Sequence, residues 1–140
     1  AMPALNEIWT ADRTGPTLLN GKPCQVSQCK QLDKANILTS SPDFFNPEEF
    51  KQFEQLSENT RYRRYGGDCY TYAMLAGGWV DLVVESGLFP FDYLPLVPIV
   101  EQAGGVISDW QGNALNLQSG PQVIASATPE LHEAALASLN

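Results

Sequence analysis

Two short stretches of the sequence concentrate polar groups in positions where chemistry is possible. The first is Gly66-Gly67-Asp68, at the predicted junction of a strand with a helix. Glycines at such a junction let a ligand approach the backbone, and the unpaired N–H groups of a helix N-terminus suit an oxygen-rich ligand. A structural interpretation is also available, in which the glycines make a turn and Asp68 caps the helix. The pattern by itself favours the structural interpretation.

The second stretch runs from Glu85 to Asp92. Glu85 ends a predicted strand and Asp92 begins a predicted helix, so we expect both carboxylates near one edge of the sheet. Open α/β sheets usually bind their ligands at that edge, beyond the carboxyl ends of the strands. Asp92 is a candidate ligand for Mg²⁺, which takes carboxylate oxygens and often only one or two from each segment. The alternative role for Asp92 is again a helix cap, and the pattern leaves both open.

The elements that position these residues alternate from about residue 36 onward. Strands are predicted at 36–40, 62–65, 79–85, 106–110 and 122–127. Helices are predicted from Pro47, at 68–76 and 92–102, and from Pro129, with Asn46 as the cap of the first. This β-α-β-α-β-α-β-β-α order predicts a layered α/β domain, in which helices pack on a mixed sheet.

The first 27 residues form a separate unit in this interpretation. Short alternating runs and a tight-turn signal at Asn20-Gly21 predict a β-hairpin at 1–27, followed by the α/β domain at 28–140. The hairpin has too few apolar residues for a core of its own, and a lone two-stranded hairpin is marginal in water. We therefore expect the hairpin to be mobile or to pair with a second copy of the chain.

Composition excludes several classes of protein. The chain has 140 residues and a net charge of -8, which argues against a protein that binds the nucleic-acid backbone. No apolar run approaches the roughly 20 residues that a membrane helix needs. The first residues carry no signal-peptide pattern. These features predict a cytoplasmic protein without a nucleic-acid or membrane partner.

Cysteine and histidine usage excludes further chemistry. The three cysteines, Cys24, Cys29 and Cys69, are too few for a disulfide scaffold, and no second Cys/His pair completes a zinc site. His132 is the single histidine, and no Gly-x-Ser-x-Gly elbow accompanies it. We therefore expect His132 to be a solvated helix residue and exclude histidine-based nucleophilic catalysis.

Four blocks of the sequence together resemble a known family. They are Gly-Gly-Asp-Cys-Tyr at 66–70, Asp-Leu-Val-Val-Glu-Ser-Gly-Leu at 81–88, Phe-Asp-Tyr at 91–93 and Glu-Gln-Ala-Gly-Gly-Val-Ile-Ser-Asp-Trp at 101–110. Their order and spacing are similar to those of the C-terminal half of the inositol monophosphatase superfamily, and the first two blocks resemble most its histidinol-phosphate phosphatase branch. The chain departs from the pattern at Phe91, where Trp or Tyr is usual, and at Phe89, where this branch often has Lys.

The resemblance implies Mg²⁺-dependent hydrolysis of a small phosphate monoester, such as histidinol phosphate or inositol phosphate. It implies that Asp92 is a metal ligand and also contacts the substrate, together with Glu85 and the helix start at Gly66, Gly67 and Asp68. The two further acids, Asp68 and Glu85, suit a cationic amine such as that of histidinol better than neutral inositol.

One family motif is absent from the sequence. Members of the family are about twice as long, and most of their metal site lies in the first half, including an Asp-Pro-x-Asp-Gly-Thr motif that this chain lacks. We therefore expect the chain to need a missing N-terminal half as its partner, to be inactive alone, and to donate its hairpin to the sheet of that half. The resemblance also implies a possible homodimer. The alternatives are a non-catalytic binding or assembly module, and a sugar-phosphate or nucleotide phosphatase of the same superfamily.

Overall fold

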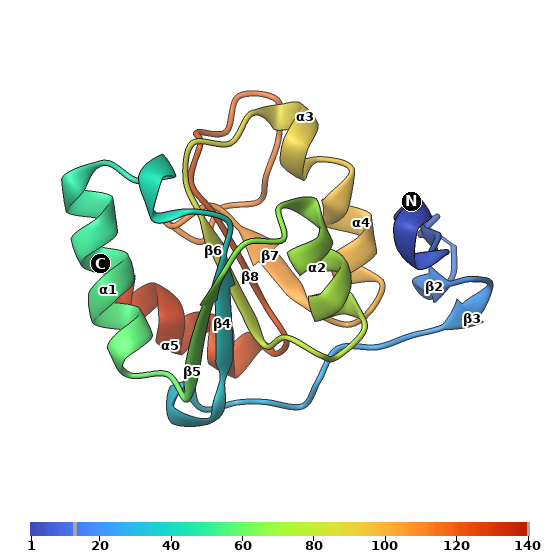
Figure 1. Ribbon diagram of the computed structural model, residues 1–140, viewed down its shortest axis with the longest axis horizontal. Coiled ribbons are helices and arrows are strands. Elements are labelled where there is room, and N and C mark those ends of the chain that lie inside the picture. The colour runs from blue at the N-terminus through green and yellow to red at the C-terminus, as the bar shows by residue number, and fades with distance from the viewer. Residues whose placement is uncertain (13, 140) are drawn as a thin grey trace.

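A three-layer arrangement dominates the computed structural model, which describes residues 1–12 and 14–139 (Figure 1). The central sheet has five strands, β4 (Asn36–Thr39), β5 (Tyr62–Tyr65), β6 (Leu82–Glu85), β7 (Val106–Ser108) and β8 (Val123–Ser126). Helices α1 (Pro47–Glu58) and α5 (Pro129–Leu139) pack on one face of the sheet. Helices α2 (Cys69–Ala76), α3 (Pro90–Tyr93) and α4 (Leu96–Glu101) pack on the other face.

The sheet is mixed, and its strands lie in the order β5-β4-β6-β8-β7. Strand β4 runs parallel to β5 and to β6, whereas β8 runs antiparallel to β6 and to β7. Leu38 lies opposite Val83 in the pairing of β4 with β6, so these two strands end at the same edge. The observed element order and the mixed sheet confirm the predicted α/β class.

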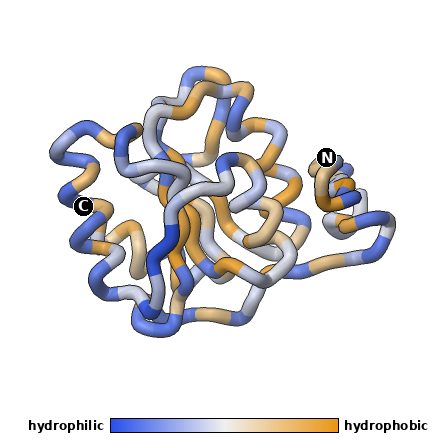
Figure 2. The backbone as a smooth tube through the Cα atoms, viewed as in Figure 1, coloured by the Kyte–Doolittle hydropathy of each residue, from blue (hydrophilic) through white to orange (hydrophobic). Residues whose placement is uncertain are grey.

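Two apolar clusters hold the helices to the sheet. Leu82 and Val84 of β6 belong to the cluster beneath α1 and α5, while Val83 belongs to the cluster beneath α2 and α4. This alternation follows from the period of two in a strand that is buried on both faces. Figure 2 shows the resulting distribution, with hydrophobic residues in the central strands and a hydrophilic stretch along the edge strand β5.

Local chemistry explains where α1 begins. The side chain of Asn46 accepts hydrogen bonds from the backbone N–H groups of Glu48 and Glu49, and Glu49 accepts one from the Asn46 N–H in return. This reciprocal capping box satisfies donors that a helix start otherwise leaves unpaired. Pro47 occupies the first helical position, where its missing N–H has no cost. The predicted cap at Asn46 is confirmed.

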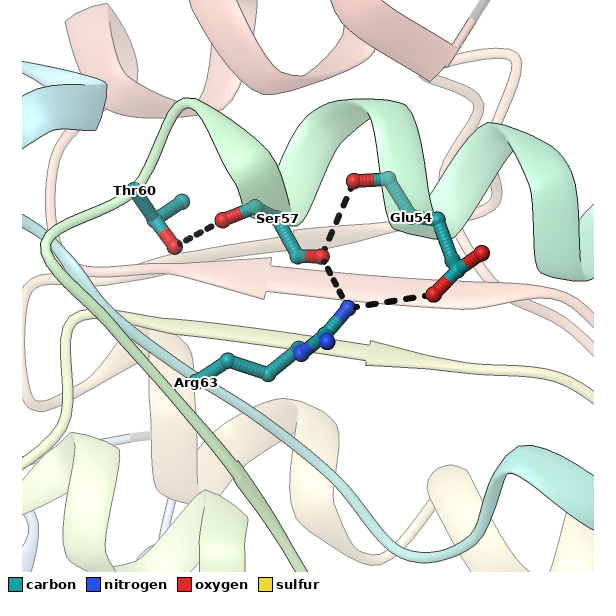
Figure 3. A network of polar contacts seen from close by, with 4 residues as sticks. All are labelled: Glu54, Ser57, Thr60 and Arg63. Atoms are coloured by element: carbon teal, nitrogen blue, oxygen red, sulfur yellow. Dashed lines mark hydrogen bonds and ion pairs between the residues drawn. The ribbon is translucent and has the colours of Figure 1, made fainter.

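A polar network fastens β5 to the end of α1 (Figure 3). Nη1 of Arg63 donates to Oγ of Ser57 at 2.9 Å and lies 3.4 Å from a carboxylate oxygen of Glu54. The hydroxyl of Ser57 donates to the Glu54 carbonyl, and the hydroxyl of Thr60 donates to the Ser57 carbonyl. The network holds Arg63 of β5 against the C-terminal part of α1.

The helix predicted at 92–102 is wrong in its bounds, because the structure has two shorter helices there. The first, α3, begins two residues earlier, with Pro90 at its first position, and α4 follows after a turn at Leu94 and Pro95. Pro95, in the turn between them, lacks the backbone N–H that a continuous helix would need at this position. No helix among residues 1–12 and 14–139 is long and apolar enough to cross a membrane.

The expectation of a solvated His132 is wrong. The side chain is 6% exposed and lies between two serines, with Nε2 2.8 Å from Oγ of Ser108 and Nδ1 3.0 Å from Oγ of Ser126. Burial lowers the pKa of His132 to about 4, so the ring is neutral at pH 7. The two serines at the ends of β7 and β8 supply the partners that make burial of the ring possible.

The opening segment forms a small antiparallel sheet of β1 (Trp9–Thr10), β2 (Leu18–Leu19) and β3 (Lys22–Pro23). Asn20 and Gly21 have φ angles of 49° and 76° and make the tight turn between β2 and β3. Both residues tolerate this left-handed conformation better than others do. The predicted hairpin turn is therefore confirmed, and a third short strand extends it.

Hydrogen bonds anchor this opening sheet to the α/β domain. The hydroxyl of Thr17, which is fully buried, donates to the Ile99 carbonyl of α4 at 2.7 Å. Where the chain leaves the sheet, the Val26 N–H donates to the Ala103 carbonyl at 3.0 Å. These contacts join the opening sheet to the α/β domain in this structure, while the expectations of a mobile hairpin, of pairing with a second copy and of pairing with a missing half stay predictions.

We predict that Thr17→Val lowers the free energy of unfolding by about 1–2 kcal/mol, because it removes the buried hydroxyl donor while keeping the side-chain shape. Urea unfolding followed by far-UV circular dichroism measures the difference. Thr10→Val is the matched control, because Thr10 is exposed on the same small sheet. Equal stabilities of the two variants would contradict an anchored opening sheet.

Candidate active site

A cavity of about 640 Å³ opens at the edge where β4 and β6 end. Ser40 follows β4, Glu85 ends β6, Asp68 precedes α2 and Asp92 lies in α3, and all four line the cavity. The predicted meeting of Glu85 with Asp92 at one sheet edge is confirmed by this lining. Asp68 joins them because β5 is parallel to β4 and delivers the chain to the same edge.

Glu85 forms the buried floor of the cavity, and its side chain is 1% exposed. Its Oε1 accepts hydrogen bonds from the Ser40 N–H at 2.9 Å and the Ser40 hydroxyl at 2.7 Å, and its Oε2 accepts one from the Thr39 hydroxyl at 3.2 Å. The pKa of Glu85 is raised to about 7: burial is the main cause, the three hydrogen bonds oppose the rise, and the charge of Asp68 adds to it. The carboxyl group is thus poised to change charge near neutral pH.

The backbone at residues 66–68 takes an unusual path. Gly66, Gly67 and Asp68 all have positive φ angles, of 97°, 109° and 43°. A Cβ atom on Gly67 would lie 2.8 Å from Cγ2 of Thr71, so glycine is required there for space as well as for conformation. The Gly66 N–H donates to the carbonyls of Thr39 and Ser40, which ties this path to the end of β4.

The structural interpretation of Asp68 as a side-chain cap is not supported. Asp68 is the residue directly before α2, but its side chain makes no capping hydrogen bond with the described residues. Its conformation, with φ 43° and ψ -131°, is one that residues other than glycine seldom adopt. Asp68 therefore presents its carboxylate at the cavity without serving the helix.

Asp92 combines a structural contact with a free oxygen. Its Oδ2 accepts a hydrogen bond from the Phe89 N–H at 2.8 Å, which stabilises the start of α3 from the third helical position and not from the cap position itself. Among the described residues, none donates to its Oδ1. A carboxylate oxygen on a cavity wall fits a hard cation. However, residues 1–12 and 14–139 contain no cluster of three His, Cys, Asp or Glu side chains that would complete a metal site.

Tyr72 is a site residue that the sequence analysis missed. It lines the cavity from α2, its side chain is 2% exposed, and its hydroxyl has no hydrogen-bond partner among the described residues. Burial raises the pKa of Tyr72 well above its usual value, and the charges of Glu85 and Asp92 add to the rise. The spacing of four residues from Asp68 is the signal that places both on one side of the helix start.

The mouth of the cavity is apolar and aromatic. The rings of Phe89 and Phe91 stack with their centroids 5.4 Å apart and an interplanar angle of 14°. Leu88 and Leu96 line the same wall. Within the described part of the chain, no Lys, Arg or His lines the cavity, whereas Asp68, Glu85 and Asp92 do, so the cavity has an acidic character. The arrangement favours a cationic ligand that also carries apolar or aromatic surface.

Comparison with solved structures gives the same architecture. The family model described as the inositol monophosphatase family matches residues 1–140. An inositol monophosphatase from Zymomonas mobilis is 41% identical, superposes with a TM-score of 0.95, and is matched over 98% of this chain and 54% of its own. A Thermotoga maritima IMPase is 28% identical with a TM-score of 0.85, over 99% of this chain and 53% of its own.

Curated relatives carry three kinds of name. The bifunctional phosphatase IMPL2 of Arabidopsis thaliana, described as chloroplastic, is 39% identical over 98% of this chain and 42% of its own length. A histidinol-phosphatase of Chlorobaculum parvum is 31% identical over 79% of this chain and 43% of its own. The Nus factor SuhB of Escherichia coli is 30% identical over 98% of this chain and 52% of its own. The chain thus spans about half the length of the curated relatives it matches.

The raised pKa of Glu85 predicts a pH-dependent stability. In the unfolded chain the carboxyl loses its proton near pH 4.5, whereas in the folded chain it does so near pH 7. The stabilisation that protonated Glu85 provides is therefore complete below pH 4.5 and is lost as the pH rises through 7. The full difference corresponds to a loss of about 3 kcal/mol in the free energy of unfolding.

Glu85→Gln mimics the protonated carboxyl and tests this prediction. We expect the variant to gain stability relative to the wild type as the pH rises from 5 to 8, measured by urea unfolding at each pH. Glu133→Gln is the control for loss of one negative charge, because Glu133 lies exposed on α5. Parallel pH profiles for Glu85→Gln and the wild type would show that Glu85 has an ordinary pKa.

Proposed function

Because this chain belongs to the inositol monophosphatase family, we propose that it forms the C-terminal half of a Mg²⁺-dependent phosphatase that hydrolyses a small phosphate monoester. The observation that carries the proposal is the convergence of Asp68, Glu85 and Asp92 on one cavity at the carboxyl edge of the sheet. Open α/β sheets bind their ligands at this edge. The chain matches only about half of each relative's length, so the other half supplies the rest of the site in this proposal.

Asp92 is the metal-binding residue of this half. Its free Oδ1 offers one oxygen to the cation, while the Phe89 N–H fixes the other oxygen and so holds the carboxylate in place. When bound, Mg²⁺ places positive charge beside the phosphate oxygens and lowers the pKa of a coordinated water. A single carboxylate is too little for this ion, which is reluctant to dehydrate, so the remaining ligands come from the preceding half.

Glu85 and Asp68 hold the alcohol part of the substrate. Ser40 and Thr39 fix both oxygens of Glu85, so the carboxyl accepts a hydrogen bond from a substrate hydroxyl or amine without reorganising. Leu88 and Leu96 line the cavity with apolar side chains, which lowers the local dielectric and strengthens that contact.

The charge of the cavity favours an amine-bearing alcohol over a neutral polyol. Two carboxyl groups beyond the metal ligand face the same space, and within the described residues no cation of the protein compensates them. A substrate ammonium group would compensate the two negative charges through charge-assisted hydrogen bonds. Histidinol phosphate therefore fits the cavity better than inositol phosphate, and a relative named histidinol-phosphatase is consistent with this choice.

We predict that residues 1–140 alone release no phosphate from histidinol phosphate, inositol phosphate or fructose bisphosphate in the presence of Mg²⁺. The physical reason is the incomplete metal site described above. A phosphate-release assay measures this turnover. The positive control is the same chain extended at its N-terminus by the first half of a protein of the family. Turnover by the short chain that Asp92→Asn abolishes would contradict the prediction.

We predict further that Asp92→Asn in the full-length protein lowers kcat by about two orders of magnitude or more while the melting temperature stays nearly constant. Asparagine keeps an oxygen that accepts the Phe89 N–H but loses the negative charge. Glu49→Gln is a matched control, because it makes the equivalent change in the capping box of α1, away from the cavity. A kcat close to that of the wild type at saturating Mg²⁺ would show that Asp92 only stabilises the start of α3.

A non-catalytic binding module is the second candidate function. The name Nus factor, carried by a relative that matches 98% of this chain, is not the name of an enzyme. The phosphate-release assay on the full-length protein separates the two functions. Absence of Mg²⁺-dependent release from every phosphate ester tested would favour the binding module.

A further inference from the structure

The two phenylalanines at the cavity mouth are unusually open to solvent. Phe89 is 61% exposed and Phe91 is 74% exposed, although their rings stack on each other. Neither side chain belongs to the two apolar clusters that hold the fold together. Large aromatic surface left open beside a cavity that contains carboxyl groups is typical of a place where a ligand is bound.

The backbone of this segment is held without help from the rings. The Asp92 carboxylate binds the Phe89 N–H, and the Leu88 N–H donates to the Pro121 carbonyl at 3.2 Å. Pro90 fixes the first position of α3 between the two phenylalanines. The backbone of residues 88–92 therefore positions the two rings, whereas the rings contribute little to the conformation of that backbone.

The stacked rings line the same cavity as the carboxyl groups of Asp68 and Glu85. The faces of aromatic rings attract cations and also stack against other flat rings. The acidic floor and the aromatic mouth of the cavity together fit one kind of ligand. Such a ligand has a flat ring that contains nitrogen and is joined to a positively charged amine. A saturated polyol offers neither the flat face nor the charge.

We infer that Phe89 and Phe91 determine substrate specificity by stacking on a flat, nitrogen-containing ring in the alcohol part of the substrate, while Asp68 and Glu85 hold its ammonium group. The inference rests on the proposed function and narrows its substrate class. The phosphate end of such a substrate lies toward Asp92, and the ring lies at the mouth.

The test uses Phe91→Leu in the full-length protein, because leucine keeps an apolar side chain of similar bulk but has no aromatic face. We expect KM for histidinol phosphate to rise about tenfold, with kcat unchanged. KM for inositol phosphate should not change. Phe91→Trp should restore the KM for histidinol phosphate. Leu117→Ala, at a side chain that is 71% exposed and does not line the cavity, controls for loss of exposed apolar surface.

An equal rise in KM for both substrates would overturn the inference, because Phe91 would then support the site without contacting the substrate ring specifically. Unchanged KM for histidinol phosphate in Phe91→Leu and Phe89→Leu would also overturn it. Absence of turnover in the wild type would count against the proposed function instead. In that case calorimetric titration with histidinol decides: weaker binding to Phe91→Leu supports ring stacking, and equal or undetectable binding to both proteins rejects it.

Discussion

The parallel pairing of β4 with β6 is the constraint on which the candidate site depends. With Leu38 opposite Val83, both strands end together, and the Ser40 N–H and hydroxyl reach the Glu85 carboxylate. A register shift of one residue would turn Glu85 to the opposite face of the sheet. Since β5 is also parallel to β4, the strained turn at Gly66 begins at the same edge. Three segments distant in sequence therefore meet because of the direction and the register of the strands.

The site is built at a cost to stability. Glu85 is buried where its charged form is disfavoured, Asp68 adopts a conformation that most residues avoid, and the buried Tyr72 hydroxyl has no partner among the residues that the structure describes. Each of these features costs on the order of 1–3 kcal/mol in other proteins. Their concentration around one cavity is the usual sign of a binding or catalytic site.

Local sequence signals predicted some features and missed others for identifiable reasons. The start of α1 followed from Asn46 and Pro47, because a cap is specified by neighbours in sequence. The burial of His132 could not be predicted in this way, because its partners Ser108 and Ser126 come from two strands that are adjacent only in the fold. Similarly, the Tyr72 hydroxyl has no partner within the described part of the chain because of what lies across the cavity, which the local sequence does not show. The roles assigned to the carboxylates stay predictions.

The edge strand β5 has a consequence for the behaviour of the protein in concentrated solution. An open strand edge is a template for aggregation, because its free N–H and C=O groups accept a strand from another molecule. The residues Tyr62–Tyr65 read Tyr-Arg-Arg-Tyr in both directions, and all four are exposed. Antiparallel association of two such edges in register sets arginine against arginine, and like charges directly opposite repel. The palindrome thus makes this edge resistant to self-assembly into extended sheets.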